Sequence, residues 1–270
     1  EQLEENGVDV HLSDGIKGFL CDGDKASSVK LESGTEIEAD FFIVGIGVRP
    51  NVSLAKECGL EIGKFGGITT NDYMQTNDPD IYAVGDAVEY TFGPTNSPLP
   101  VALAGPANIS GRIAADHAVL GRSHKMGAVL GTSILRVFKA TAAMTGVTMN
   151  IAKKMDIQTK FVTVNLKDHA GYFPGATPIL LKIVFSPEDG KLLGAQAVGE
   201  NGVDKRIDVC ATVLQMGGTV YDMENLDLSY APPFGSAKDP IHMAAFGACN
   251  ILDHYVNYVD YDENLSKYQL

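Results

Sequence analysis

The feature that most constrains the fold is the stretch from Thr132 to Glu200, where apolar residues alternate with polar ones or run together in short segments. The segments SILRVFKATAAMTGVT, QTKFVTVNL and PILLKIVF are rich in β-branched and apolar residues, which favours strands. Before KLLGAQAVGE stand Glu188, Asp189 and Gly190, which are typical of a hairpin turn. Tight hairpins join antiparallel strands, so this part of the chain predicts an antiparallel sheet.

Two helices are predicted to follow this sheet. The segment VDKRIDVCATVLQMGG, from Val203, is typical of a helix that stops at Gly217 and Gly218. The segment KDPIHMAAFGACNILDHY, from Lys238, is typical of a second helix. Strands followed by helices form an α+β layer, and we expect one in the C-terminal half.

The N-terminal half has a different character. Its first residues, EQLEENG, predict the end of a helix that stops at Gly7, and a strand is expected from about Val8. A Ser-Gly turn at residues 33–34 precedes an apolar strand over Phe41–Ile46, which Pro50 cannot extend. A chain that opens inside a helix feeding a strand indicates that half of a βαβ unit lies upstream.

Further along, the segment NDPDIYAVGDA predicts a turn at residues 77–79 and a strand over Ile81–Val84. Residues 100–120, PVALAGPANISGRIAADHAVL, predict a helix of small side chains. Such a helix can approach a flat group or another backbone closely. The N-terminal half is therefore expected to be α/β.

The charge balance excludes one class of partner. The chain carries 21 Lys and Arg residues against 34 Asp and Glu residues, a net charge of −13, and it has no run of basic residues. Nucleic-acid binding is therefore not expected. No apolar stretch reaches the length of about 18 residues that a membrane span needs, so no membrane association is expected either.

Cysteine usage indicates the cellular compartment. Cys21, Cys58, Cys210 and Cys249 are widely spaced and form no CxxC pair. We interpret them as reduced thiols of a cytoplasmic protein. Neither they nor the six histidines have the spacing of a metal site, so no metal is expected.

One carboxylate stands out, because Asp86 directly follows the predicted strand Ile81–Val84 and Gly85. An ionised carboxylate accepts hydrogen bonds, and ligands of open α/β sheets bind beyond the carboxyl ends of strands. If a helix begins near Ala87, its free N–H groups suit a phosphate at the same place. A ligand in which a polyol is joined to a pyrophosphate could hydrogen-bond to the carboxylate through its hydroxyls and to the N–H groups through its phosphates. The alternative is an N-cap that stabilises a helix by about 1 kcal/mol, and the residues favour neither interpretation.

Several long segments, among them TNDPDIYAVGDA and FFIVGIGVRPN, resemble those of one enzyme family, the pyridine nucleotide–disulfide oxidoreductases. TNDPDIYAVGDA resembles their second FAD-binding motif, and FFIVGIGVRPN resembles the segment that returns from the NAD(P)H-binding domain to the FAD domain. HAGYFPGATPILLKIVF, GKLLGAQAVGENGVDKRIDV and LDLSYAPPFGSAKDPIHMAAFGACN resemble the dimerisation domain of the coenzyme A-disulfide reductase, NADH oxidase and NADH peroxidase branch. The likeness covers roughly residues 1 to 252, in the expected order.

The resemblance implies an α/β chain with remnants of FAD- and NAD(P)-binding Rossmann-like domains, followed by an α+β dimerisation domain with an antiparallel sheet. The NAD(P)H-binding remnant is expected at residues 1–48 and the FAD-binding part at residues 49–128. The dimerisation domain is expected at residues 129–255, and an acidic tail at residues 256–270. A homodimer formed through the C-terminal domain is also implied.

The chain departs from the family pattern in one respect. The family carries two Gly-rich dinucleotide fingerprints and a redox cysteine in its N-terminal half, and none of these is visible here. Cys21 and Cys58 do not match the redox position. The chain therefore resembles the C-terminal portion of such an enzyme, with the upstream half either lost or not included in the sequence.

The resemblance also implies a cofactor site. Asp86 would hold a ribityl hydroxyl of FAD, and Gly85 and Ala87 would share that contact through their backbone. Val101 and Ala102, in PLPVALAGPAN, match the stretch that offers backbone groups to the far end of the flavin ring. The alternative for these last two is a tightly packed helix start.

Three further residues match positions that reach the active site of the neighbouring subunit in coenzyme A-disulfide reductases: Tyr172 in HAGYFPG, and Tyr230 and Lys238 in SYAPPFGSAKD. Tyrosine hydroxyls can donate to a thiolate or a sulfur leaving group, and lysine can meet a phosphate of coenzyme A. The alternatives are a packed tyrosine for Tyr230 and a surface charge for Lys238. His169 precedes the first tyrosine and is interpreted as structural.

The implied activity is that of an FAD-dependent NAD(P)H:disulfide oxidoreductase of the coenzyme A-disulfide reductase type. Electrons would pass from NAD(P)H to FAD, to a cysteine held as a mixed disulfide with coenzyme A, and to a small-molecule disulfide. An NADH oxidase or peroxidase, with oxygen or peroxide as the acceptor, is the alternative in the same class. In a different class, the isolated chain would be a non-catalytic dimerisation fragment.

Overall fold

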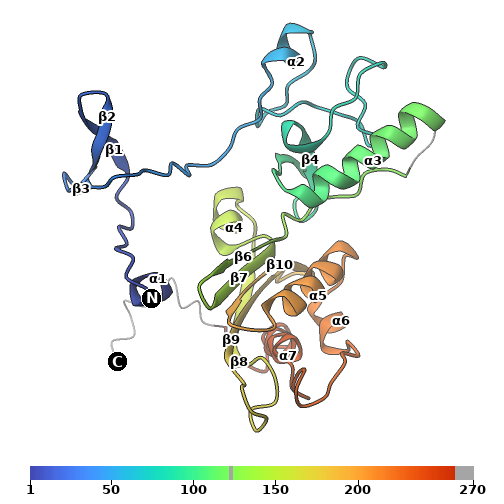
Figure 1. The fold of residues 1–270 in the computed structure, drawn as a ribbon. Coiled ribbons are helices and arrows are strands. Elements are labelled where there is room, and N and C mark those ends of the chain that lie inside the picture. The colour runs from blue at the N-terminus through green and yellow to red at the C-terminus, as the bar shows by residue number, and fades with distance from the viewer. Residues whose placement is uncertain (122–123, 259–270) are drawn as a thin grey trace. The chain divides into compact units, whose positions relative to one another are not determined.

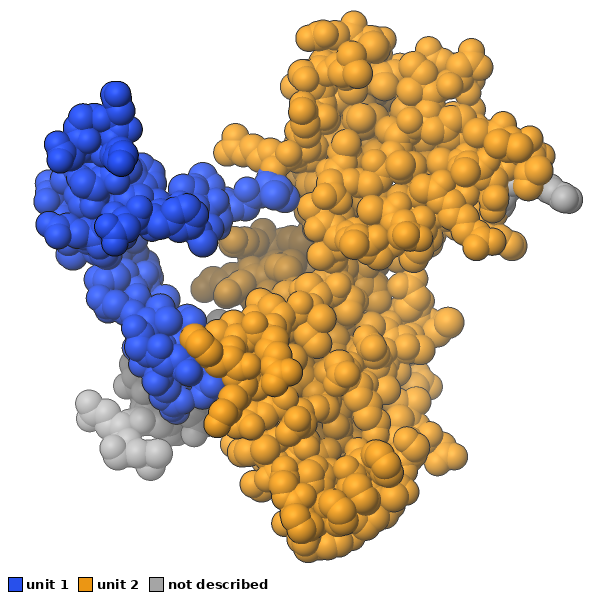
Figure 2. Space-filling model, in the orientation of Figure 1, with its two compact units in different colours: residues 1–48 blue, residues 49–270 orange. Residues whose placement is uncertain are grey.

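The computed structural model describes residues 1–121 and 124–258. The chain separates into two compact units, residues 1–48 and residues 49–270, which Figure 2 shows in different colours. The predicted acidic tail falls mainly on residues 259–270, which lie outside the described residues.

Residues 1–48 contain a short helix and a small antiparallel sheet of strand order β1-β2-β3. The elements are α1 (Gln2–Glu5), β1 (Ile16–Asp22), β2 (Lys25–Leu31) and β3 (Glu36–Glu38). The predicted Ser-Gly turn is confirmed between β2 and β3, where the Leu31 N–H donates to the Thr35 carbonyl at 2.9 Å. Gly34 has a φ of 93°, a conformation that side-chain-bearing residues rarely adopt.

Three strands predicted in the N-terminal half are wrong. No strand begins near Val8, and residues 41–46 form none, with Phe41 77% and Ile43 85% exposed. Residues 81–84 make only an isolated bridge, between Gln75 and Tyr82. An apolar run favours a strand, but the strand forms only where a neighbour supplies the hydrogen bonds. No described strand pairs with residues 41–46.

The second unit begins with α2 (Ser53–Glu57) and the 3-10 turn η1 (Gly85–Ala87), followed by a two-stranded ribbon and a long helix. The ribbon pairs β4 (Glu89–Phe92) with β5 (Ser97–Pro100), and the helix is α3 (Ala104–Leu120). The helix predicted over residues 100–120 is confirmed, with a later start because Pro100 still belongs to β5. It ends at Gly121, whose φ is 63°.

The predicted antiparallel sheet is confirmed as five strands in the order β6-β7-β10-β9-β8, with every neighbouring pair antiparallel (Figure 1). The strands are β6 (Ser133–Val137), β7 (Ala140–Gly146), β8 (Lys160–Lys167), β9 (Pro178–Phe185) and β10 (Leu192–Gly199). The hairpin at residues 188–190 joins β9 to β10, and Gly190 has a φ of 70°.

The two predicted helices are confirmed as α5 (Val203–Gln215) and α7 (Pro240–Leu252), which pack against the sheet (Figure 1). Fully buried Ile179, Leu181 and Ile183 of β9 share one core with both helices. Two short helices of the C-terminal half were not predicted, α4 (Met149–Met155) and α6 (Val220–Glu224). Each spans fewer than eight residues, too few to show a helical repeat, and each begins at a threonine cap.

Candidate functional site

The turn that carries Asp86 exposes its carboxylate. Gly85 has a φ of 76°, which bends the chain into η1 before it enters β4. Asp86 is exposed, and its carboxylate accepts no hydrogen bond from any described residue. No helix begins near Ala87, because η1 is three residues long and β4 follows it, so the condition for a phosphate at helix N–H groups is not met. The N-cap interpretation fails with it, and the carboxylate is left available to a ligand.

Two buried hydroxyls fix the backbone of this turn. The Tyr90 hydroxyl donates to the Gly85 carbonyl at 3.0 Å and lies 3.0 Å from the Ser110 hydroxyl of α3. The Gly85 N–H in turn donates to the Ser110 oxygen at 3.4 Å. Burial raises the pKa of Tyr90, so this phenol stays protonated and keeps donating. Sequence reasoning missed both residues, since Tyr90 reads as an ordinary strand position and Ser110 as one more small residue of a helix.

The other two predicted cofactor contacts lie beside this turn. Glu89 of β4 pairs with Pro100 of β5, so η1 and residues 101–102 leave the same end of the ribbon. Val101 is 7% exposed and its carbonyl accepts from the Leu103 N–H at 3.0 Å, whereas Ala102 is exposed. The structure therefore brings the five predicted residues to one end of a ribbon, next to the first turns of α3.

The predicted tyrosines meet on two loops of the C-terminal sheet domain. Tyr172 lies between β8 and β9, Tyr230 lies between α6 and α7, and their hydroxyl oxygens are 3.1 Å apart. Both side chains are exposed, Tyr172 by 78% and Tyr230 by 49%. The hydrogen bond with Tyr172 raises the pKa of Tyr230. Lys238 is exposed on the second loop, and no described contact joins its side chain to either tyrosine.

A buried polar cluster lies under these loops. Arg206 of α5 is 1% exposed, and its guanidinium pairs with the Asp239 carboxylate at 2.7 Å. His169 Nδ1 lies 2.8 Å from Asp168 Oδ2, while His169 Nε2 is buried without a partner among the described residues. Although burial raises the pKa of Asp168, hydrogen bonds from His169 and the Thr177 N–H hold it below its ordinary value. The structural role that we assigned to His169 remains a prediction.

The four cysteines fall into two kinds. Cys21 and Cys58 are exposed, whereas Cys210 and Cys249 are buried. Burial raises the pKa of both buried thiols to about 12, and an interaction with Glu224 contributes at Cys249. The buried pair is therefore held as unreactive thiols, because the thiolate is the nucleophile. Within residues 1–121 and 124–258, no group of three or more His, Cys, Asp or Glu side chains could hold a metal ion.

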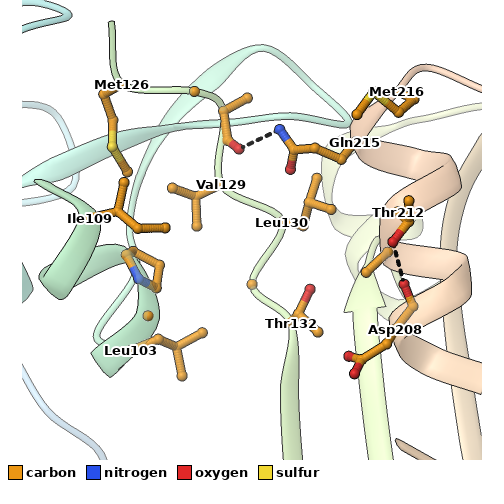
Figure 3. Close-up of a pocket in the computed structure, with 16 residues that line it drawn as sticks. Leu103, Ile109, Met126, Val129, Leu130, Thr132, Asp208, Thr212, Gln215 and Met216 are labelled. Atoms are coloured by element: carbon orange, nitrogen blue, oxygen red, sulfur yellow. Dashed lines mark hydrogen bonds between the residues drawn. The ribbon is translucent and has the colours of Figure 1, made fainter. Parts of the chain in front are cut away.

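A pocket of about 720 Å³ lies between the start of α3, residues 126–132 and α5 (Figure 3). Its lining is largely apolar, with Ile109 and Val129 across from the polar side chains of α5. The Gln215 side chain donates to the Ala128 carbonyl at 3.2 Å and ties its two walls together. The residues predicted for cofactor or substrate contact do not line it. None of the helices in the described ranges combines the length and apolar character that crossing a membrane requires.

Two family models match the chain. Residues 1–106 match the pyridine nucleotide-disulphide oxidoreductase model, and residues 132–240 match the dimerisation domain of the same family. The two matches follow each other in the order predicted from the sequence motifs.

Named relatives and solved structures show the same likeness. An NAD(P)H sulfur oxidoreductase (CoA-dependent) of Pyrococcus furiosus is 39% identical over 85% of this chain and 51% of its own length. A coenzyme A disulfide reductase of Staphylococcus epidermidis is 34% identical over 92% of this chain and 55% of its own. The chain thus spans about half the length of the curated relatives it matches.

Among solved structures, reduced CoADR-RHD of Bacillus anthracis is 41% identical, with a TM-score of 0.92 over 98% of this chain and 48% of its own. A water-forming NADH oxidase from Lactobacillus brevis is 25% identical, with a TM-score of 0.87 over 94% of this chain and 56% of its own. Both the mixed α/β fold and the predicted family are confirmed by these comparisons.

Proposed function

The chain belongs to the pyridine nucleotide-disulphide oxidoreductase family, and from that premise we propose that it is the C-terminal part of an FAD-dependent NAD(P)H:disulfide oxidoreductase. Coenzyme A disulfide, or a related coenzyme A-linked sulfur compound, is the proposed substrate class. The observation that carries this is the exposed pair Tyr172 and Tyr230, whose hydroxyls are held 3.1 Å apart. The names of two similar relatives refer to coenzyme A, and this supports the same choice.

The residues at the ribbon end fit an FAD. Asp86 presents an exposed carboxylate without a described protein partner, and a carboxylate is the acceptor that a chain of hydroxyl groups requires. Ala102 is exposed beside it, with no side chain beyond Cβ to keep a flat ring away from the backbone. We assign Gly85, Asp86, Ala87, Val101 and Ala102 to this site. Bound FAD supplies the electron transfer, and these residues hold and orient it.

The tyrosine pair acts on the substrate. In the proposed homodimer, the loops of Tyr172 and Tyr230 reach the active site of the partner subunit, where the phenols donate hydrogen bonds to sulfur. The Lys238 ammonium on the same exposed loop meets a phosphate of coenzyme A. The redox cysteine would come from residues outside this sequence. We also propose that the protein works in the cytoplasm, where NAD(P)H and reduced thiols are maintained.

Steady-state assays of the purified full-length protein test this function. We expect NADH or NADPH consumption to depend on added coenzyme A disulfide, with little consumption when oxygen or hydrogen peroxide is the only acceptor. The similarity to a water-forming NADH oxidase makes oxygen the informative rival. Oxygen-dependent turnover that equals the disulfide rate would overturn the substrate assignment. The 270-residue chain alone is the control, and we expect no turnover because it carries no Gly-rich dinucleotide fingerprint.

Replacing Asp86 with alanine in the full-length protein should weaken flavin binding. Hydrogen bonds to a charged acceptor contribute about 1.5–3 kcal/mol, so we expect the flavin dissociation constant to rise roughly 10- to 150-fold. Flavin absorbance per polypeptide, measured after gel filtration, reports the loss. Asp80→Ala is the matched control, since Asp80 is an exposed carboxylate in the same segment. Equal flavin content in the two variants would contradict the assignment of Asp86.

A further inference from the structure

We propose that Arg206 is a positioning residue that fixes the Tyr172 and Tyr230 loops relative to each other. Only the expected effect of this positioning on turnover rests on the proposed function. Arg206 is buried in α5 and reaches neither tyrosine. It acts instead on Asp168 and Asp239, which stand at the bases of the two loops. Nothing in the sequence pattern singled it out.

The contacts of one nitrogen join the two loops. Arg206 Nη2 donates to the Asp168 carbonyl oxygen at 2.7 Å and to Asp239 Oδ2 at 2.7 Å. Asp168 precedes Tyr172 by four residues, and Asp239 follows Tyr230 on the other loop. Because the guanidinium is planar and its donors have fixed directions, one side chain sets the separation of the two loop bases.

Each loop base is itself rigid. The Asp168 N–H donates to the Thr177 carbonyl at 3.0 Å, and the Thr177 N–H donates to Asp168 Oδ1 at 2.6 Å, which closes the first loop. Asp239 Oδ1 accepts from the Ile241 N–H at 3.0 Å and so ties the second loop to the start of α7. Above these bases, the Ala170 N–H donates to the Pro232 carbonyl at 3.3 Å. A shift at Arg206 is therefore transmitted to both tyrosines.

The backbone is shaped to hold the guanidinium. Gly202 has a φ of 69°, and its carbonyl accepts from Arg206 Nη1 at 3.2 Å. A Cβ at position 202 would clash with that nitrogen. Such a side chain would push the guanidinium away, so glycine is required here on two counts.

The position needs this cation for geometry rather than for stability. A buried ion pair seldom stabilises a protein more than apolar residues of the same volume, because taking both charges out of water is costly. Its fixed hydrogen-bond directions do specify one arrangement of the groups around it. The groups positioned in this way are the tyrosine hydroxyls, which lie 3.1 Å apart on two otherwise exposed loops.

The test uses a spectroscopic signal of the hydroxyl contact in the full-length protein. With 3-fluorotyrosine at position 230, ¹⁹F NMR follows the ionisation of that phenol, whose pKa the contact with Tyr172 raises. The variants are Arg206→Lys, which keeps the charge, and Arg206→Met with Asp239→Asn, which removes both charges and leaves no unpaired ion in the interior. Arg112→Lys, an exposed arginine of α3, is the control.

In the double variant, we expect the titration midpoint of position 230 to fall towards that of a free tyrosine. In Arg206→Lys the midpoint should fall only part of the way, and in the control it should not change. Because the tyrosine hydroxyls would then be misplaced relative to the substrate, kcat/KM for the disulfide should fall about tenfold to a hundredfold in the double variant. An unchanged midpoint in either folded Arg206 variant overturns the inference, whatever happens to turnover. A shifted midpoint with wild-type turnover supports the positioning role but contradicts the proposed role of the tyrosines.

Discussion

Replacing Asp239 with asparagine will lower the free energy of unfolding by about 3–5 kcal/mol, because Arg206 is then left as an uncompensated charge in the interior. The side chains of Arg206 and Asp239 are 1% and 4% exposed, so water cannot take over the lost interaction. Asparagine can still accept from the Ile241 N–H and preserve the start of α7, so the change isolates the charge. Urea denaturation followed by far-UV circular dichroism measures the loss.

Two comparisons separate the effect of charge from that of substitution in general. Asp72→Asn removes the acidic partner of an exposed ion pair with Lys125, and we expect its denaturation midpoint to match the unsubstituted chain. Arg206→Met combined with Asp239→Asn removes both buried charges and should recover much of the stability lost in Asp239→Asn. A double variant as unstable as Asp239→Asn alone would show that packing, not the unpaired charge, causes the loss.

The parts of the fold that the sequence predicts correctly are those specified by local patterns. The turn at residues 188–190 lies between two β-rich segments, so both the turn residues and the pattern around them identify one hairpin. The failed strand over Phe41–Ile46 has an equally apolar sequence. Its formation depends on hydrogen-bonding partners elsewhere, and local pattern carries no information about them.

The candidate site divides in the same way. Asp86 is visible in the sequence because a bare carboxylate follows an apolar segment and a glycine. The tyrosine contact joins residues 58 positions apart, and only the folded structure of the sheet domain shows that the two loops meet. Arg206 is harder still to find, since arginine is an ordinary residue of an amphipathic helix and burial of its charge depends on three separate segments.

The largest effect on catalysis is expected at the tyrosine pair. Tyr172→Phe and Tyr230→Phe, each made in the full-length protein, should lower kcat/KM for the disulfide substrate about 100-fold, the usual contribution of a positioned proton donor. Each change removes one hydroxyl and keeps the ring, so flavin content and the rate of flavin reduction by NAD(P)H should stay at the level of the unsubstituted protein. Stopped-flow absorbance separates that reductive step from disulfide turnover.

The double variant tests whether the two hydroxyls act as one unit. Because they are bonded to each other at 3.1 Å, loss of either one already disrupts the donor presented to sulfur. We therefore expect Tyr172→Phe with Tyr230→Phe to lose little more than the worse single variant, far less than the product of the two losses. Tyr221→Phe, which removes an exposed hydroxyl bonded to Asp253, should retain full activity. Losses that multiply would mean that the two phenols act at independent places.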